Sequence, residues 1–440
     1  MTYRPPRRWL IFCALGLCLT AGSSLWRLTR EHRRSQVRPL VEALPQDPHL
    51  QVFFNQSEAS VYTDPYRQMD RHGDDLEQVI VTAIDQSEIS VDIAVQALNL
   101  PAIAQAIAGS ARRGVQVRLI LENQYAQPEA EQAEALQILN GSNIAKLDDT
   151  ADGSKGSGLM HHKFLVVDQR LVITGSANFT LSGIHGDRDA PESRGNANML
   201  LKIDSPTVAR AFTEEFNLMW GDGPGGAPDS EFGLQKAYRA PQTLSLPTGT
   251  LTLQFSPVSA SKPWEQSVNG LIARTLSQAT QSVDMALFVF SDQKIANQLE
   301  TQVKAGTALR ALIDPGFIYR SYSEALDMLG IVLPNQHCKV EDNNQPWTSP
   351  IHSVGSPQLP EGDKLHHKFA IVDQQTVIVG SQNWSHAANT QNDETLMVIQ
   401  NPTVAAHFNR EFERLYRAPL LGHTPAIQRK TAAEKQRCIY

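Results

Sequence analysis

The chain has 440 residues, of which 41% are hydrophobic and 19% charged, so it is an ordinary globular protein long enough for two large domains or repeats. Its net charge is −7, but the first 34 residues hold seven Arg and one Glu, a net of +6, so the remaining residues carry −13. A body this acidic excludes general electrostatic attraction as the means of holding a polyanion, although it is compatible with a local basic pocket.

The N-terminal segment, residues 1–34, has the pattern of an export signal or a membrane anchor. Three arginines precede an uncharged stretch from Trp9 to Trp26, and small residues follow Thr20. The stretch is near the lower limit for spanning a bilayer, and arginines on both sides leave its orientation open. A cleaved signal peptide and a retained anchor both remain open, and each predicts an exported or membrane-anchored body on the periplasmic or extracellular side.

An internal repeat organises the rest of the chain. Each half begins with a strand of the same pattern, Val91–Ala94 in the first half and Val283–Ala286 in the second. The other expected pairs are helices 101–113 and 292–305, strands 115–121 and 308–313, and closing helices that start on Pro-Thr-Val-Ala at Pro206 and Pro402. The alternation predicts an α/β fold of two tandem repeats, each a mixed, mostly parallel sheet flanked by helices, packed about a pseudo-twofold axis.

The repeat also sets the expected domain boundaries. They are residues 1–34 for the signal or anchor, 50–222 for the first repeat, 223–249 for a Gly/Pro-rich linker, 250–418 for the second repeat and 419–440 for a C-terminal tail. The body has two cysteines, Cys338 and Cys438. In an exported protein they could pair and close a long loop, or both could stay free, and neither has the spacing of a metal site.

One chemical motif, H-x-K-x(4)-D-x(6)-G-S-x-N, occurs in each half without a gap. Its residues are His161, Lys163, Asp168, Ser176 and Asn178 in the first copy, and His366, Lys368, Asp373, Ser381 and Asn383 in the second. On a strand, histidine and lysine two residues apart share one face, where lysine offers a charge to phosphate and histidine acts as nucleophile or general acid. Ser and Asn supply neutral donors for the phosphate. His162 and His367 face the other way and are predicted to be structural.

With these two motifs the sequence resembles the phospholipase D superfamily over nearly all of residues 50–418. The resemblance implies a phosphoric diester hydrolase that needs no metal or other cofactor. One histidine attacks phosphorus and forms a phosphohistidine, while the other protonates the leaving oxygen and then activates water or an acceptor alcohol. The lysines and asparagines hold the non-bridging oxygens, and Asp168 and Asp373 are supporting residues. Because one chain carries both motifs, a monomer is expected to be functional.

The halves differ at the residue expected to support each catalytic histidine. The family commonly has an acidic residue downstream of the motif, which is Glu394 in the second half, and Asn198 takes its place in the first. A carboxylate partner raises the pKa of its histidine, here His366, whereas an amide partner does so much less for His161. This predicts His161 as nucleophile and His366 as general acid, unless another carboxylate serves His161.

Three segments are expected around the site. Residues 148–160 and 335–365 are predicted to wall the pocket. An insertion of nine residues around 183–194 adds His185, Arg188 and Arg194, which either contact substrate or belong to a solvated loop.

The acidic body and the export segment favour a phospholipid at a membrane surface as substrate, with transfer to an alcohol as a side activity. An exported or membrane-tethered nuclease is the alternative, because the ending Asn-Trp-Ser at Asn383 also occurs in nuclease-like and cardiolipin-hydrolysing relatives. The motif endings and the single apolar segment argue against a cardiolipin synthase, and the two intact motifs argue against an inactive binding module. The head group and the oligomeric state stay open.

Overall fold

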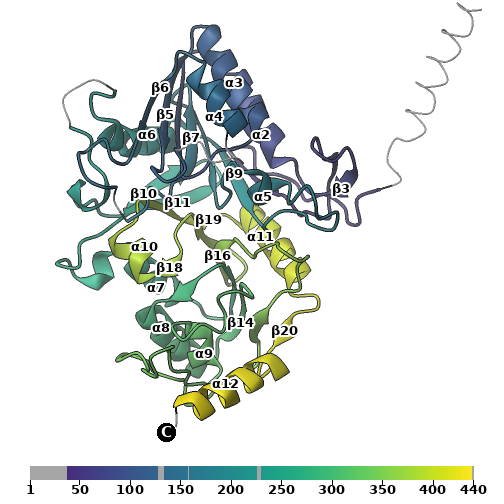
Figure 1. The fold of residues 1–440 in the computed structure, drawn as a ribbon. Helices are drawn as coiled ribbons and strands as arrows, with labels where there is room; N and C mark the ends of the chain where they lie inside the picture. The colour runs from purple at the N-terminus through teal and green to yellow at the C-terminus, as the bar shows by residue number, and fades with distance from the viewer. Residues whose placement is uncertain (1–36, 127–132, 157, 225–228, 439–440) are drawn as a thin grey trace, which may run out of the picture.

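The computed structural model describes residues 37–126, 133–156, 158–224 and 229–438. The chain forms two lobes, each built on one large sheet (Figure 1). The first sheet has the order β1 (Leu50–Phe54), β9 (Met199–Asp204), β8 (Leu171–Gly175), β7 (Lys163–Val167), β4 (Ser90–Val95), β5 (Gln116–Leu121), β6 (Ala145–Asp148). The second has the order β10 (Gln242–Leu246), β11 (Gly249–Ser256), β19 (Glu394–Gln400), β17 (Thr376–Gly380), β16 (Lys368–Val372), β12 (Ser282–Leu287), β14 (Ala308–Ile313), β15 (Val354–Ser356), β20 (Leu420–Leu421).

The two sheets repeat one topology and are mixed, as expected, but most of their pairings are antiparallel. Parallel pairing joins β4 to β5 and β5 to β6 in the first sheet, and β12 to β14 and β14 to β15 in the second. The expectation of mostly parallel sheets was therefore wrong. The tight turn at Asp168–Gln169 connects β7 directly to β8, and such a short connection forces adjacent strands to run antiparallel.

Helices cover both faces of each sheet (Figure 1). The outer helices are α2 (Leu76–Asp85), α3 (Pro101–Arg112) and α4 (Ala133–Asn140) on the first lobe, and α7 (Val268–Leu276), α8 (Gln293–Lys304) and α9 (Glu324–Met328) on the second. The closing helices are α6 (Pro206–Trp220) and α11 (Pro402–Leu415). Each begins where the sequence predicts, because Pro occupies its first turn, and the side chain of Ser205 or Asn401 caps its free backbone amides.

The closing helices join the lobes through a shared aromatic core. Phe212 of α6 packs edge-on against Phe255 of the second sheet at 5.4 Å between ring centroids, and Phe408 of α11 packs against Phe54 of the first sheet at 5.3 Å. These reciprocal contacts belong to one continuous cluster of buried side chains that draws on both sheets. Burial of this apolar surface therefore holds the halves in a pseudo-symmetric arrangement.

Shorter elements complete the lobes. They are β2 (Val61–Thr63), β3 (Asp70–His72), α5 (Leu181–Ile184), β13 (Phe290–Ser291), β18 (Trp384–Ser385), α10 (His386–Thr390), α12 (Pro425–Cys438) and single 3-10 turns at Gly233–Gln235 and Trp264–Gln266. Strand β10 lies inside the segment expected as a linker, and β20 and α12 lie inside the expected tail. All three elements belong to the second lobe, since β10 and β20 extend its sheet and α12 packs on it through Ile427.

Helix α12 is also joined covalently to its lobe. Cys338 and Cys438 form a disulfide, which resolves the open alternative between paired and free cysteines. No helix within the described residues has the length and apolar character needed to cross a bilayer, and the N-terminal segment discussed above lies outside those residues.

The disulfide closes a loop across a sequence separation of 100 residues, so its loss releases much unfolded-state entropy. Cys438→Ser is expected to cost about 2–4 kcal/mol and to lower Tm by roughly 5–10 °C in calorimetry without reductant. Turnover by the folded fraction is expected to stay unchanged. An unaltered Tm, or free thiols at Cys338 and Cys438 in the oxidised wild-type protein, would contradict the bond.

Candidate active site

The two motif histidines lie where the lobes meet. Each lies two residues before its motif lysine, which begins strand β7 in the first lobe and strand β16 in the second. The backbone amide of His161 donates to the carbonyl of Asp393 at 3.0 Å, and that of His366 donates to the carbonyl of Ala197 at 3.1 Å. Each histidine is thus attached to the segment that leads into β9 or β19 of the opposite lobe.

This exchange between lobes decides which side chain supports each histidine. His161 Nδ1 lies 2.7 Å from Glu394 Oε2, and His366 Nδ1 lies 2.9 Å from Asn198 Oδ1. The sequence-based pairing within each half was therefore wrong. Its cause is geometric, because the segments just before β9 and β19 cross the junction: Ala197 pairs with Leu365, and Asp393 pairs with Met160.

The partners set the same tautomer in both rings. Asn198 Nδ2 donates to the carbonyl of Gly183 at 2.8 Å, so its Oδ1 is the atom that accepts from His366. An ionised Glu394 can only accept, so the proton between it and His161 sits on Nδ1. Both rings therefore keep Nε2 free of these partners, and Nε2 is the atom that can attack phosphorus or deliver a proton.

The motif lysines are buried beside the histidines. Lys163 Nζ donates to the carbonyl of His161 at 2.7 Å and to Gln96 Oε1 at 3.2 Å. Lys368 Nζ donates to the carbonyl of His366 at 2.7 Å and lies 4.8 Å from the ring centroid of Phe288. Gln96 and Phe288 follow equivalent strands of the two lobes. Lys163 therefore has a polar neighbour where Lys368 has an aromatic one.

Burial and mutual repulsion keep the site poor in positive charge. Burial, followed by the nearby lysines, lowers the pKa of both His161 and His366 well below the usual range. Burial lowers the pKa of Lys163 to about 7 and that of Lys368 well below its usual range. Burial also raises the pKa of Glu394 to about 7, although Lys163 opposes that shift. A bound phosphate would supply the anion that these groups need in order to be charged.

The Gly-Ser-x-Asn residues divide into two groups. Ser176 Oγ donates to Asn198 Oδ1 at 2.8 Å, and Ser381 Oγ donates to Glu394 Oε2 at 2.7 Å. Both hydroxyls are buried and thus hold the partners of the histidines, in contrast to the expected role as phosphate donors. Asn178 Oδ1 and Asn383 Oδ1 accept no hydrogen bond from the described residues. The Nδ2 groups of these two amides are the donors that remain candidates for phosphate contact.

The motif aspartates lie at the far ends of the same strands. Asp168 accepts from the backbone amides of Glu88, Ile89 and Ser90. Asp373 accepts in the same way from residues 280–282. They tie a turn to the start of the neighbouring strand, which agrees with the expected supporting role away from substrate.

The second histidine of each motif faces the aromatic core. His162 bonds Glu215 at 2.9 Å through Nε2 and Thr395 at 2.9 Å through Nδ1. His367 bonds Glu411 at 2.9 Å. The glutamates recur at one place in the two closing helices, but the aromatic residues around them pointed only to core packing. The sequence signal that could have identified Glu215 and Glu411 as partners of these histidines is that each is a charged residue repeated on an otherwise apolar helix face.

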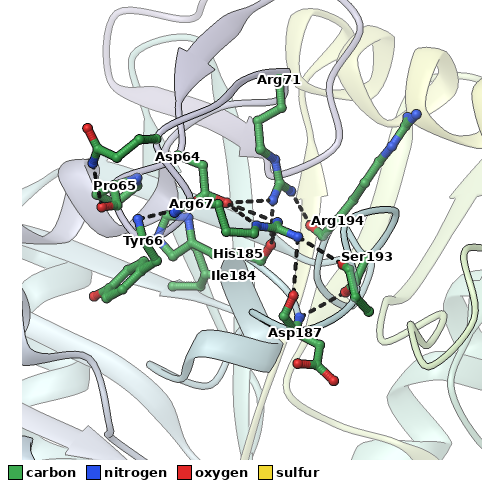
Figure 2. A network of polar contacts seen from close by, with 12 residues as sticks. Asp64, Pro65, Tyr66, Arg67, Arg71, Ile184, His185, Asp187, Ser193 and Arg194 are labelled. Atoms are coloured by element: carbon green, nitrogen blue, oxygen red, sulfur yellow. Dashed lines mark hydrogen bonds and ion pairs between the residues drawn. The ribbon is translucent and has the colours of Figure 1, made fainter.

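The insertion is held by the segment around strands β2 and β3 of the first lobe (Figure 2). Arg67 donates to the backbone carbonyls of His185 and Asp187, and Arg71 donates to those of His185 and Arg194. Asp64 accepts from both guanidinium groups, as Figure 2 shows. These bonds hold the backbone of the insertion in a defined position, so it is an ordered wall.

Across the junction, Asp363 accepts from the hydroxyl of Ser193 and the amide of Arg194 at 2.5 and 2.7 Å. The side chain of Arg194 is exposed and points away from the network (Figure 2). Arg188 stacks over Tyr66 at 5.2 Å. Of the two arginines of the insertion, for which substrate contact and a solvated loop were both open, Arg188 lines a cavity and Arg194 does not.

That cavity has a volume of about 460 Å³ and lies at the lobe junction. Its walls include Leu181, three residues after Asn178, and Asp363, three residues before His366. They also include Asn99, whose Oδ1 accepts from the amide of Leu181. Four acidic side chains line it, namely Glu134, Asp187, Asp189 and Asp363. Of the two expected wall segments, 335–365 contributes to this cavity, whereas 148–160 crosses to residues 391–393 of the second lobe.

Comparisons with known proteins agree with this architecture. The family described as "Cardiolipin synthase, PLD-like domain" matches residues 80–220 and 272–416. The phosphatidylserine synthase structure from Haemophilus influenzae Rd KW20 is 11% identical, has a TM-score of 0.54 and covers 90% of this chain and 94% of its own, so it supports the fold.

Two curated relatives match part of the chain. Human mitochondrial cardiolipin hydrolase is 31% identical over 152 residues, 34% of this chain and 52% of that protein. Phospholipase D of Rickettsia conorii is 27% identical over 137 residues, 31% of this chain and 60% of that protein. The chain thus spans roughly half to three-fifths of their length.

Two copies of the family motif and one composite site make this a member of the phospholipase D superfamily. The chain contains two tandem phospholipase D-like domains.

The charge state of Lys163 gives a test of phosphate binding. With a pKa of about 7, this lysine is about half neutral at pH 7, and a bound oxyanion raises its pKa. Binding of orthovanadate is therefore expected to take up protons at pH 7, which calorimetry in buffers of different ionisation enthalpy measures. Lys163→Arg, which cannot titrate, is expected to reduce the uptake. Binding heats that are independent of the buffer would contradict this electrostatic description.

Proposed function

We propose that the protein hydrolyses the phosphodiester of a phospholipid at a membrane surface, through a covalent phosphohistidine on His161. The observation that carries the chemistry is the pair of histidines with free Nε2 atoms, His161 on Glu394 and His366 on Asn198, beside two buried lysines. Hydrolysis is the main reaction, and transfer to an alcohol is a side activity of the same intermediate.

The assignment of His161 as nucleophile now rests on a different argument from the sequence-based one. Burial and the lysines lower the pKa of both motif histidines, which favours the neutral ring that a nucleophile requires, so the hydrogen-bond partners are what distinguish the two. When Nε2 bonds to phosphorus, the ring becomes positively charged, and the Glu394 carboxylate stabilises that charge by accepting a hydrogen bond from Nδ1–H. Asn198 gives His366 no such stabilisation, so a proton on His366 is more easily given to the leaving oxygen.

A lipid substrate is favoured over a nucleic acid by charge. The residues after the N-terminal segment carry −13, a net charge that repels an extended polyanion. Two relatives whose names specify cardiolipin hydrolysis and phospholipase D activity support the same choice. A nuclease with this site is the alternative that the substrate assay below tests.

We also propose that the body lies on the exported side of a membrane, either released or anchored by residues 1–34. The apolar N-terminal stretch supports this location. The Cys338–Cys438 disulfide supports it independently, because structural disulfides form and persist mainly in oxidising compartments.

Glu394→Gln tests the division of labour. The change keeps the size of the side chain but removes the charge that stabilises phosphorylated His161, worth about 2 kcal/mol, so kcat is expected to fall roughly 30-fold. Asp168→Asn is the matched control, since it makes the same chemical change away from the site, and it is expected to lower Tm while leaving kcat unchanged. Equal kcat for Glu394→Gln and wild type would refute the proposed role of Glu394.

The substrate class is tested with two assays on one preparation. Vesicles containing cardiolipin, phosphatidylcholine and phosphatidylethanolamine are expected to release a water-soluble head group or phosphatidic acid, and supercoiled plasmid is expected to remain intact. His161→Asn is the control that must abolish lipid turnover. Plasmid cleavage that His161→Asn abolishes, with no lipid turnover, would establish the nuclease instead.

A further inference from the structure

A buried lysine that lies between the two repeats contacts both lobes beside the catalytic pair. Lys236 follows the first repeat and lies outside both segments that match the family, 80–220 and 272–416. Its Nζ lies 2.5 Å from Glu215 of helix α6 in the first lobe and 2.6 Å from Asp393 of the second lobe. It also donates to the carbonyl of Ser256 at 3.3 Å. The side chain is 3% exposed, so these bonds are shielded from solvent.

Asp393 is the residue through which this lysine reaches the site. Its carbonyl accepts from the amide of His161 at 3.0 Å, and its amide donates to the carbonyl of Leu159 at 2.9 Å. Its side chain is held by Lys236 and by the amide of Gly233 at 2.9 Å. The next residue along the chain is Glu394, the partner of His161. Any shift of Asp393 therefore moves both ends of the His161–Glu394 hydrogen bond.

Glu215 gives Lys236 a second connection to the same strands. It bonds His162, the neighbour of His161, and His162 in turn bonds Thr395, the neighbour of Glu394. Lys236 thus closes a ring of buried contacts around the catalytic pair. Arg239 adds a further ion pair to Glu215, so the buried carboxylates Glu215 and Asp393 face two cations.

Among the described residues, no equivalent connection is found for the histidine of the second lobe. There, Glu411 bonds His367 as Glu215 bonds His162, and Arg414 of the same helix balances its charge at 2.8 Å. The described contacts of Arg414 do not reach the segment that carries Asn198, the partner of His366. The link between a buried cation and the segment that supports the histidine is therefore specific to His161.

We infer that Lys236 is a positioning residue for the reaction, which holds Glu394 against His161 by joining Glu215 of one lobe to Asp393 of the other. This inference rests on His161 and Glu394 acting in the reaction as proposed above. A carboxylate displaced by about 1 Å no longer stabilises charge on the ring, and misplacements of that size cost on the order of 100-fold in rate. Lys236 itself touches no reacting atom.

The test compares Lys236→Met with Arg414→Met in the full-length protein. Each variant removes one buried cation that balances a glutamate of a closing helix, so both are expected to lose thermal stability. With bis(p-nitrophenyl) phosphate as a soluble probe, Lys236→Met is expected to lose roughly 10- to 100-fold in kcat per folded molecule, with KM nearly unchanged. Arg414→Met is expected to keep its kcat. Equal losses in the two variants, or no loss in Lys236→Met, would overturn the inference.

A charge-balanced double variant separates positioning from folding. Lys236→Met combined with Asp393→Asn removes one buried cation together with one buried anion, so Tm is expected to recover towards the wild-type value. The kcat is expected to stay low, because the bond between the lobes is still missing. Recovery of kcat together with Tm would show that Lys236 acts only on stability. Full activity of His161→Asn on the same probe would instead refute the proposed function itself.

Discussion

The hydrogen bond from His161 to Glu394 is the contact on which the rest of the site depends. It joins a histidine of the first repeat to a carboxylate of the second, at 2.7 Å and away from solvent. A reciprocal bond joins His366 to Asn198. Neither repeat holds a complete histidine and partner pair, so the catalytic unit exists only when the lobes pack through their shared aromatic core. Folding and chemistry are therefore coupled at this junction.

The two repeats share one fold but differ chemically at a few equivalent positions around His161 and His366. Glu394 and Asn198 occupy equivalent positions in the two repeats, and so do Gln96 and Phe288. The glutamate of the closing helix is balanced by Lys236 of the connecting segment in the first lobe and by Arg414 of the same helix in the second. Each difference makes the surroundings of His161 more polar or more charged than those of His366. A symmetric site would give two equivalent histidines, whereas a two-step displacement needs one to attack and one to transfer a proton.

The sequence predicted the lobes, the helix starts and the motif residues well, because these depend on local patterns repeated twice. It failed on strand direction, where the tight turn at Asp168 outweighed the α/β alternation. It also paired Asn198 and Glu394 with the wrong histidines, since sequence alignment within a repeat contains no information about exchange between repeats. Ser176 and Ser381 fit a phosphate site by residue type, but their burial against those partners appears only in three dimensions.

Lys236 could not be identified by comparing the two repeats either. It has no counterpart in the second repeat and no motif around it, so only the folded chain brings it to Glu215 and Asp393. Residues that connect lobes are the ones that repeat-based reasoning is least able to find.

The most direct measurement is the identity of the phosphorylated histidine. A His366→Asn variant lacks the group that activates water, so it is expected to accumulate the covalent intermediate when mixed with a labelled p-nitrophenyl phosphodiester, whose leaving group departs without a general acid. Peptide mapping under alkaline conditions, which preserve phosphohistidine, then locates the label. The account predicts phosphate on the peptide that contains His161 and its loss in the double variant with His161→Asn. Phosphate that appears on the His366 peptide of a His161→Asn variant, and not on His161, would contradict it.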